Sequence, residues 1–340
     1  MNSVLEYRSC PNCGKDDFTV LFESNITDGD FQKGIETVYM LPGGKYGRHV
    51  RCRNCHLVYV NPIEGNGKIN GDYSQRKSND ASIIRTSRLR AAKSQVQLIR
   101  KYGSGTNLLD VGCGEGFFLF DASKMGYIVR GVELSQDAAE YARREFSLDV
   151  EAKSFEEVEF PESYFDVVTL WQVLEHVPYP LIILKKVHRI LKPGGVVAVA
   201  TPNFGGILAK TLRKRWWNIR ELHINQFTAD TLKNMLGSAG FEDMDTVCYK
   251  EHISLPMLVI PILRYLKICE RLEALICPNS EWGKITKVKS QNAKVKITNQ
   301  KSKILLFSFL SLISFPYPSR LDNCNMIAVK PQNGDRNCNS

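Results

Sequence analysis

The chain has 340 residues, of which 43 % are hydrophobic and 24 % are charged, as is typical of a soluble globular protein. This length excludes a single minimal domain and predicts two or three folded units. The formal net charge of +9 at pH 7 indicates an acidic partner, which could be nucleic acid, anionic lipid or a phosphorylated small molecule.

The amino terminus reads MNSVLEYRSC and has no cationic segment followed by an apolar run. We therefore expect no secretory signal and a cytoplasmic, reducing location. The chain contains ten cysteines, and in a reducing compartment correctly spaced cysteines indicate metal binding rather than a disulfide framework.

Two C-x-x-C pairs lie near the amino terminus: Cys10 with Cys13, and Cys52 with Cys55. Each two-residue gap lets both sulfurs of a pair face one tetrahedral ion. The four thiolates predict a structural Zn²⁺ site that holds together a small zinc-ribbon-like unit over residues 1–62. Paired disulfides or a redox-active C-x-x-C are the alternatives. Four sulfurs complete the coordination, so no catalytic role is expected for this ion.

Residues 63–104 are interpreted as a linker and a capping helix. The segment from Asp80 to Tyr102 has apolar residues at the spacing of an amphipathic helix. We expect this helix to pack over the mouth of the site formed by the segments that follow.

A strand, a glycine turn and a helix are predicted at Asn107 to Val111, Gly112 to Gly116 and Phe117 to Met125. A second strand, Tyr127 to Val132, follows and leads into Glu133. An acidic residue at this place can accept hydrogen bonds from both ribose hydroxyls of an adenosine, so the unit is expected to bind an adenine nucleoside. No Gly-Lys-Ser/Thr follows the glycines, which excludes a phosphate-binding loop of that type.

The choice between a dinucleotide and S-adenosylmethionine depends on Asp110 and on the glycine spacing. A carboxylate directly before the loop would repel a pyrophosphate but suits the ammonium group of a methionine moiety. The glycines follow a G-x-G-x-G pattern, whereas a dinucleotide fingerprint requires G-x-G-x-x-G. S-adenosylmethionine is therefore favoured. The alternative is that these glycines only allow a helix to pack closely on a strand.

Two further stretches extend the pattern. YFDVVTLWQVLEHV, residues 164–177, predicts a core strand, and RILKPGGVVAVATPN, residues 189–203, predicts a helix end, a Pro-Gly-Gly turn and another strand. From Leu108 to Phe241 these motifs, in this order, resemble the class I S-adenosylmethionine-dependent methyltransferases. The resemblance implies an α/β fold over residues 105–335, with a Rossmann-like, mostly parallel sheet, helices on both faces and an antiparallel last strand within NMIAVKP, residues 325–331.

The resemblance also implies the cofactor contacts. Glu133 corresponds to the ribose carboxylate, and the family's adenine-binding aspartate is replaced by the segment Ser154 to Glu156, whose backbone or Glu156 carboxylate is expected to bind the adenine. Cys113 is interpreted as packing within the loop rather than as a nucleophile. The full set of expected cofactor contacts is Asp110, Gly112, Cys113, Gly114, Gly116, Glu133, Leu134, Ser154, Phe155, Trp171 and Gln172.

Methyl transfer from a sulfonium requires mainly that the acceptor be aligned and, for a hydroxyl or carbon acid, that a proton be removed. His176 and His223 are the candidate catalytic bases, because imidazole has a suitable pKa. Trp171 and Gln172 are expected to border the methionine end of the cofactor. Trp216 and Trp217 are expected either to line the acceptor site or to belong to the core.

Residues from about 250 to 322 are interpreted as a basic and apolar helical insertion between the last two strands. The insertion is expected to form a helical cap or a peripheral contact with an anionic membrane. Its apolar run is too short to span a bilayer, and its basic run lacks interleaved aromatic residues, so nucleic acid is not an expected partner.

A cysteine unit before such a domain resembles bacterial sugar methyltransferases, including sugar C-methyltransferases. This resemblance predicts a small-molecule acceptor, namely a sugar, nucleotide sugar or glycolipid of a surface-polysaccharide pathway. A quinone-type or lipid O-methyltransferase is an alternative, and a non-catalytic module that binds zinc and S-adenosylmethionine is an alternative of another class. The sequence specifies neither the acceptor atom nor the oligomeric state.

Overall fold

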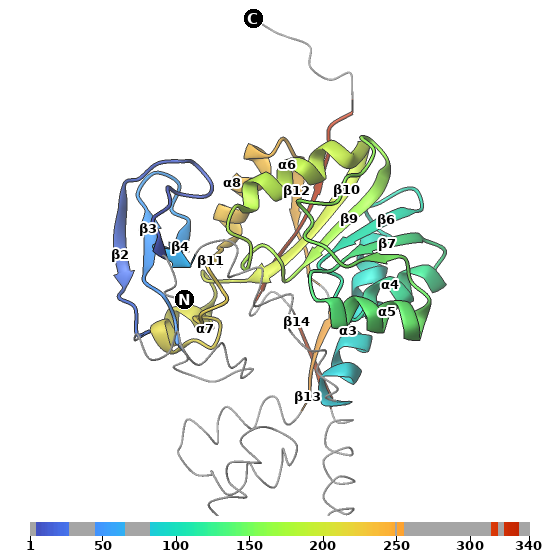
Figure 1. Ribbon diagram of the computed structural model, residues 1–340, viewed down its shortest axis with the longest axis horizontal. Helices are drawn as coiled ribbons and strands as arrows, with labels where there is room; N and C mark the ends of the chain where they lie inside the picture. Colours follow the sequence, from blue (N-terminus) through green and yellow to red (C-terminus); the bar gives the residue numbers. More distant parts are fainter. Residues whose placement is uncertain are drawn as a thin grey trace, which may run out of the picture.

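The computed structural model describes residues 5–26, 45–64, 82–248, 250–254, 314–318 and 323–332. Its centre is a seven-stranded sheet with the order β12-β15-β10-β9-β6-β7-β8 (Figure 1). The strands of this sheet are β6 (Asn107–Val111), β7 (Ile128–Val132), β8 (Val150–Glu151), β9 (Phe165–Trp171), β10 (Leu191–Pro202), β12 (Glu242–Thr246) and β15 (Asn323–Val329).

The central sheet is mostly parallel. Strand β6 pairs in parallel with both β7 and β9, and β7–β8 and β9–β10 are parallel as well. Strand β15 is antiparallel to both of its neighbours, β10 and β12. The predicted Rossmann-like sheet with an antiparallel last strand is therefore confirmed.

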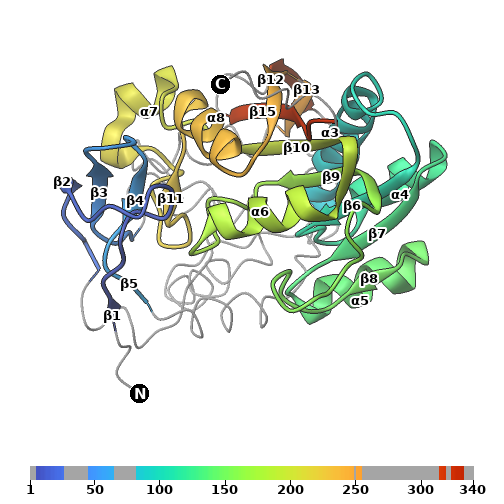
Figure 2. The ribbon, with the colours of Figure 1, turned by 90° about the horizontal axis from the view of Figure 1, so that it is seen from above.

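Helices cover both faces of the sheet (Figure 2). Helices α3 (Ser82–Ile99), α4 (Phe117–Lys124) and α5 (Gln136–Phe146) pack in the core that contains Val196, Ala198 and Ala200 of β10. Helices α6 (Pro180–Ile190) and α8 (Ala229–Ser238) pack in the core that contains Val197 and Val199. Successive residues of β10 thus face opposite cores, as expected for a strand buried on both sides.

Local sequence signals explain where these helices begin. The Ser135 hydroxyl accepts a hydrogen bond from the Ala138 amide and caps α5. Thr228 and Thr231 form a reciprocal capping box at the start of α8. Pro180 occupies the first turn of α6, where its missing N–H costs no hydrogen bond.

The amino-terminal unit is a small antiparallel sheet beside the central one (Figure 1). Strands β2 (Phe18–Phe22), β3 (His49–Cys52) and β4 (Val58–Val60) form a meander, and β1 (Leu5–Glu6) pairs with β5 (Ile63–Glu64). A strand from much later in the chain, β11 (Asn225–Gln226), adds to β4 and completes the order β11-β4-β3-β2. The unit predicted to end at residue 62 therefore shares its sheet with a strand from the part of the chain that forms the central sheet.

The short helix α7 (Ile207–Leu212) and the 3₁₀ turn η1 (Arg213–Arg215) lead into the segment with Trp216. Trp216 is fully buried with Tyr46, Ala209 and Ile219. Of the two predictions for this tryptophan, the structure supports the core position, and Trp217 packs against the same cluster.

The insertion predicted between the last two strands connects β12 to β15. Its described ends are strands rather than helices, because β13 (Lys250–Ser254) pairs antiparallel with β14 (Ser314–Pro318). The apolar and basic runs of the insertion lie outside the described residues. Within the described part of the chain, no helix has the length and apolar content needed to cross a membrane.

Candidate functional site

A cleft of about 520 Å³ opens at the carboxyl ends of β6, β7 and β9. This volume lies within the range of about 300–1,000 Å³ that small-molecule sites occupy. Ligands of open parallel sheets bind at this edge. Helix α3 contributes Arg88, Ala91, Ala92 and Gln95 to the lining, so the helix expected to cover the site does lie against it.

The glycine loop after β6 has a conformation that requires glycine. Gly112, Gly114 and Gly116 have φ values of 71°, 54° and 80°, all in the left-handed region. A Cβ at Gly112 would also lie 2.7 Å from Val173 Cγ2. Nothing lies within 4 Å of a Cβ built at Gly114, so the loop backbone there is open to a close ligand.

Glu133 holds this loop in place from the end of β7. Its Oε2 accepts a hydrogen bond of 2.8 Å from the Gly114 amide, and its Oε1 accepts one of 2.8 Å from the Ser135 amide. The side chain also lines the cleft. A carboxylate has about four lone-pair positions, so these two bonds leave capacity for ribose hydroxyls. Supporting the loop is a function of Glu133 that the sequence did not indicate.

Asp110, the last residue but one of β6, lies at the floor of the cleft with 2 % of its surface exposed. Its Oδ1 accepts a hydrogen bond of 2.6 Å from the Thr169 hydroxyl. Burial raises the pKa of Asp110 to about 8, the Thr169 bond opposes this rise, and the nearby Glu133 charge adds to it. A cationic ligand group beside Asp110 would stabilise its charged form.

The side of the cleft predicted to bind adenine contains Lys153, Ser154, Phe155 and Glu156. The Ser154 amide, one of the backbone groups expected to bind adenine, instead donates to Glu157 Oε2 at 3.2 Å. The segment is fixed from α6, because Lys186 Nζ donates to the carbonyl oxygens of residues 155, 156 and 158. Any contact from Ser154 must therefore come from its side chain or carbonyl group.

Cys113 is buried, as its predicted packing role requires. Burial raises the pKa of its thiol well above the ordinary value, and the charges of Asp110 and Glu133 raise it further. Its sulfur lies 2.7 Å from the position that a Cβ on Gly131 would occupy, so the thiol fills space between β6 and β7. A thiol that resists ionisation is not an effective nucleophile.

The turn after β9 supplies the opposite wall through Trp171, Gln172, Glu175 and His176. Trp171 is half-buried and packs edge-on against Phe118, with ring centroids 5.5 Å apart. His176 Nδ1 lies 2.7 Å from the Leu222 carbonyl oxygen, a geometry that requires the proton on Nδ1. In the neutral ring Nε2 is then the basic nitrogen, and it lies 3.9 Å from Glu175 Oε1.

His223 lies behind His176, with ring centroids 4.7 Å apart, and does not line the cleft. Its Nε2 accepts hydrogen bonds from Arg220 Nε at 2.9 Å and Arg220 Nη2 at 2.6 Å. Burial lowers its pKa well below the ordinary value, and Arg220 and His176 lower it further. The geometry therefore does not favour His223 as a base in contact with the acceptor, because its basic nitrogen is already engaged.

Glu175 is a site residue that the sequence analysis did not include among the candidates. It lines the cleft with only 1 % of its side chain exposed. Burial raises its pKa to about 7, while Thr201 and Arg220 oppose the rise. Its position in the sequence could have identified it, because it precedes His176 and comes shortly after a core strand. A carboxylate buried there is costly unless it has a function.

Glu175, His176 and His223 place one potential metal-ligating atom each within 4.8 Å of one another. Arg220 lies among them, because it lines the cleft, bonds to His223 Nε2 and lowers the pKa of Glu175. The guanidinium already supplies the positive charge that a metal ion would bring.

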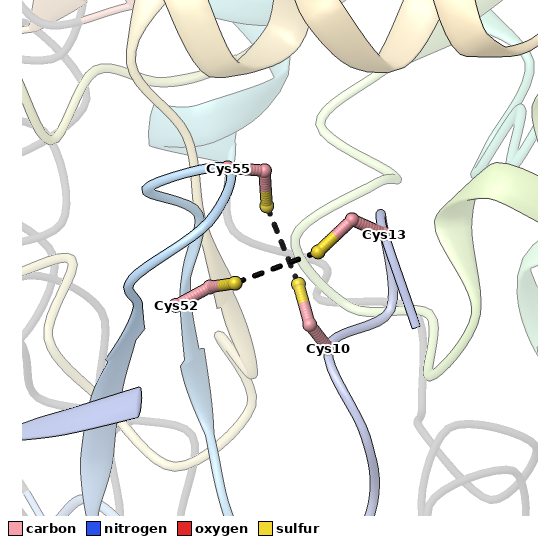
Figure 3. A group of neighbouring side chains, drawn as sticks. All are labelled: Cys10, Cys13, Cys52 and Cys55. Carbon is pink, nitrogen blue, oxygen red and sulfur yellow. Dashed lines mark hydrogen bonds between the residues drawn. The ribbon is translucent and has the colours of Figure 1, made fainter. Parts of the chain in front are cut away.

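The four predicted metal ligands converge on one point (Figure 3). The sulfurs of Cys10 and Cys55 are 3.4 Å apart, those of Cys13 and Cys52 are 3.5 Å apart, and all four lie within 4.8 Å of one another. Sulfurs 2.3 Å from a tetrahedral zinc would be about 3.8 Å apart, so the arrangement fits such an ion. The four thiols are free, and these distances are far from those of a disulfide, about 2.0 Å.

The two cysteine pairs adopt the same turn. The Gly14 amide donates to the Cys10 carbonyl at 2.9 Å, and the His56 amide donates to the Cys52 carbonyl at 3.1 Å. Gly14 and His56 both have positive φ, 70° and 62°. Exposed His56 therefore corresponds to Gly14 in the second turn and is not a fifth ligand.

A protein-family model described as a methyltransferase domain matches residues 81–246. Among curated relatives, the ubiquinone biosynthesis O-methyltransferase of Coxiella burnetii is 30 % identical over 126 residues, which cover 36 % of this chain and 52 % of that protein. The enzyme of the same name from Nitrosococcus oceani is 34 % identical over 117 residues, which cover 32 % of this chain and 50 % of that protein. The chain thus spans about half the length of these relatives.

Among solved structures, a possible histamine N-methyltransferase from Thermotoga maritima aligns with a TM-score of 0.40 and 25 % identity, covering 48 % of this chain and 76 % of that one. The [4+2]-cyclase SpnF aligns with a TM-score of 0.43 and 19 % identity, covering 72 % and 82 %. Residues 81–246 thus match a model of a methyltransferase domain, and the central sheet has the strand order of a Rossmann-like fold.

Proposed function

We propose that the chain is an S-adenosylmethionine-dependent methyltransferase that methylates a small molecule. The observation that carries this proposal is the pair of carboxyl groups at the glycine loop. Buried Asp110 lies at its start, and Glu133, which follows the neighbouring strand β7, lines the same cleft. When bound, S-adenosylmethionine supplies an electrophilic methyl group on a sulfonium.

The residues of the cleft suit the parts of this cofactor. Asp110 would hold the ammonium group of the methionine moiety, which would restore the charge that burial suppresses. Glu133 would accept hydrogen bonds from the ribose hydroxyls while keeping its bonds to the loop. The Trp171 ring, at the end of β9, would face the sulfonium.

His176 is the proposed general base for an acceptor hydroxyl. Nδ1 keeps its proton, which it donates to the Leu222 carbonyl oxygen, so Nε2 would take the acceptor proton. Nearby Glu175 would stabilise the imidazolium that forms, and Arg220 would keep Glu175 ionised. His223 would act only through His176 and Arg220, since its own nitrogen is engaged.

The proposed acceptor is a sugar, a nucleotide sugar or a glycolipid. The cysteine unit before the methyltransferase domain supports this class by resemblance, and basic Arg220 on the cleft wall suits an acceptor that carries phosphate. A quinone-type O-methyltransferase is the second candidate, because the relatives of this domain from Coxiella burnetii and Nitrosococcus oceani carry the name ubiquinone biosynthesis O-methyltransferase.

Zn²⁺ at the four cysteines is proposed as a structural ion. The separations of the sulfurs and the matching turns support it, and a closed four-sulfur site has no open position for a substrate. A cytoplasmic location and a peripheral contact of residues 250–322 with anionic membranes also stay predictions.

The test is a transfer assay with methyl-labelled S-adenosylmethionine and three acceptor sets: nucleotide sugars, glycolipids and polyprenylated phenols. Label on either of the first two sets supports the proposed acceptor class, and label only on the phenols supports the second candidate. The proposal is contradicted if the folded protein binds the cofactor but labels none of the three sets, and if His176→Gln binds the cofactor as the wild type does. The chain would then be a non-catalytic binding module.

A further inference from the structure

The loop that carries Glu175 and His176 is held by one buried amide side chain. Asn225 Nδ2 donates to the Leu174 carbonyl at 3.1 Å and to the Val177 carbonyl at 2.7 Å. Its backbone amide donates to the Glu175 carbonyl at 3.1 Å. Asn225 has no exposed surface, so these three bonds fix the loop backbone on both sides of His176 without competition from water.

The amino-terminal unit in turn holds Asn225. Arg8 Nη2 donates to Asn225 Oδ1 at 3.1 Å and to the Ile224 carbonyl at 3.0 Å. Arg8 Nη1 donates to the carbonyl of Pro178 at 2.5 Å, and its Nε donates to that of Val60 at 3.2 Å. One guanidinium therefore joins strand β4, strand β11 and the end of the His176 loop.

Arg8 is an unusual residue to find in this position. Only 6 % of it is exposed, and all four acceptors of its side-chain hydrogen bonds are neutral oxygens. Burying a charge without a carboxylate partner is costly. The rigid fork of donors can nevertheless bridge separate segments, which a single point charge such as lysine cannot do. Its position two residues before Cys10 connects this bridge to the cysteine cluster.

Backbone pairing follows the same route. The Val60 amide donates to the Ile224 carbonyl at 2.8 Å, and β11 pairs with β4 through Asn225 opposite Tyr59. Ile224 and Asn225 directly follow His223, whose ring packs on His176. The loop that carries His176 and the segment that carries His223 are therefore both held by the amino-terminal sheet. The glycine loop, in contrast, is held by Glu133.

We propose that Arg8 is a positioning residue for methyl transfer: through Asn225 and Pro178 it sets the place of His176, so that the amino-terminal unit controls the acceptor side of the site and not cofactor binding. The proposal rests on the function proposed above for the assignment of His176. It predicts that a substitution of Arg8 alters the acceptor side of the cleft and leaves the cofactor side unchanged.

The first test is hydrogen exchange measured by mass spectrometry on the full chain with saturating S-adenosylhomocysteine. In Arg8→Gln, exchange should rise at residues 173–178 and 222–227 and stay as in the wild type at residues 108–118. The matched control is Arg53→Gln, because Arg53 lies in the same unit but is 61 % exposed and forms an ion pair with exposed Asp17. The control should leave all three segments unchanged.

Two further readouts separate positioning from general stability. The affinity for S-adenosylhomocysteine and the metal content should stay within about threefold of the wild type, because Glu133 and the cysteines are untouched. The ring ¹⁵N spectrum of His176, assigned with His176→Gln, should lose the signature of an Nδ1 proton bound to a carbonyl. Arg8→Lys should restore part of the protection, since an ammonium can reach one or two of the four oxygens.

With an acceptor that the wild type methylates, kcat should fall at least about tenfold in Arg8→Gln, the order of effect that a misplaced general base produces. The proposal is overturned if residues 173–178 exchange as in the wild type, or if residues 108–118 open equally. Arg8→Lys keeps the test valid should Arg8→Gln fail to fold. Failure of the wild type to bind S-adenosylhomocysteine would instead refute the proposed function and leave the exchange result standing.

Discussion

The variant Asp110→Asn tests the buried carboxyl on which the cofactor assignment depends. Burial raises the Asp110 pKa from 3.8 to about 8, so between these values the folded state holds a proton that the unfolded chain releases. The contribution of Asp110 to the stability of the wild type therefore falls as pH rises through this window, by about 1.4 kcal/mol per pH unit. An asparagine does not titrate and still accepts the Thr169 hydrogen bond.

The expected result is that the free energy of unfolding of Asp110→Asn, relative to the wild type, increases by about 3 kcal/mol between pH 5 and pH 7. Urea denaturation of the cofactor-free protein, followed by circular dichroism, measures this difference. The same variant should lose affinity for S-adenosylmethionine, because its neutral amide cannot pair with the ammonium group. A variant with greater stability and weaker binding would show that the carboxyl is kept for the ligand.

Asp166→Asn is the matched control with the opposite sign. The pKa of Asp166 is lowered, because its bonds to Lys192 and to the amides of Asn107 and Thr106 outweigh the effect of burial. The stabilisation that ionised Asp166 gives the folded state is complete above pH 5. The free energy of unfolding of Asp166→Asn should therefore be lower than that of the wild type by an amount that stays constant from pH 5 to pH 7. A pH-independent difference for Asp110→Asn as well would refute the reasoning about the buried carboxyl.

Three other changes test separate parts of the site. Cys52→Ser should lose the bound zinc and lower the unfolding temperature, and an unchanged metal content on elemental analysis would contradict the ion site. Gly112→Ala should weaken binding of S-adenosylhomocysteine at least about tenfold in calorimetry. The reason is that φ is 71° at this position and that the new Cβ would lie 2.7 Å from Val173 Cγ2. Binding with wild-type affinity would contradict this strain. His176→Gln should slow transfer about 100-fold at unchanged cofactor affinity, whereas an unchanged rate would exclude it as the base.

The central sheet could be predicted from sequence because its signals are local. Strand β6 was expected at Asn107 to Val111 and is found there, and the helix expected from Phe117 ends within one residue of the prediction. The apolar runs of parallel strands and the glycine turn each identify an element without any knowledge of its partners. The turn predicted at Pro193, Gly194 and Gly195 was wrong, because these residues lie inside β10, where its register with β9 shifts. The spacing of the cysteine pairs predicted their convergence in the same way.

Contacts between distant segments could not be predicted. Nothing in the sequence indicates that Asn225 and Gln226 complete a sheet begun by residues 18–60, because a two-residue strand has no periodicity. The buried position of Arg8 was equally hidden, since an isolated arginine usually indicates a surface. The engagement of His223 by Arg220 was missed because a candidate base is recognised by residue type, while its availability depends on a neighbour.

The most direct test of the account is isothermal titration of the zinc-loaded full chain with S-adenosylmethionine and S-adenosylhomocysteine, alongside Asp110→Ala and Glu133→Ala. The account predicts micromolar binding of one ligand per wild-type chain and its loss in both variants, while Arg53→Gln binds as the wild type does. Absence of binding by well-folded wild-type protein would contradict the assignment of the cleft as a cofactor site.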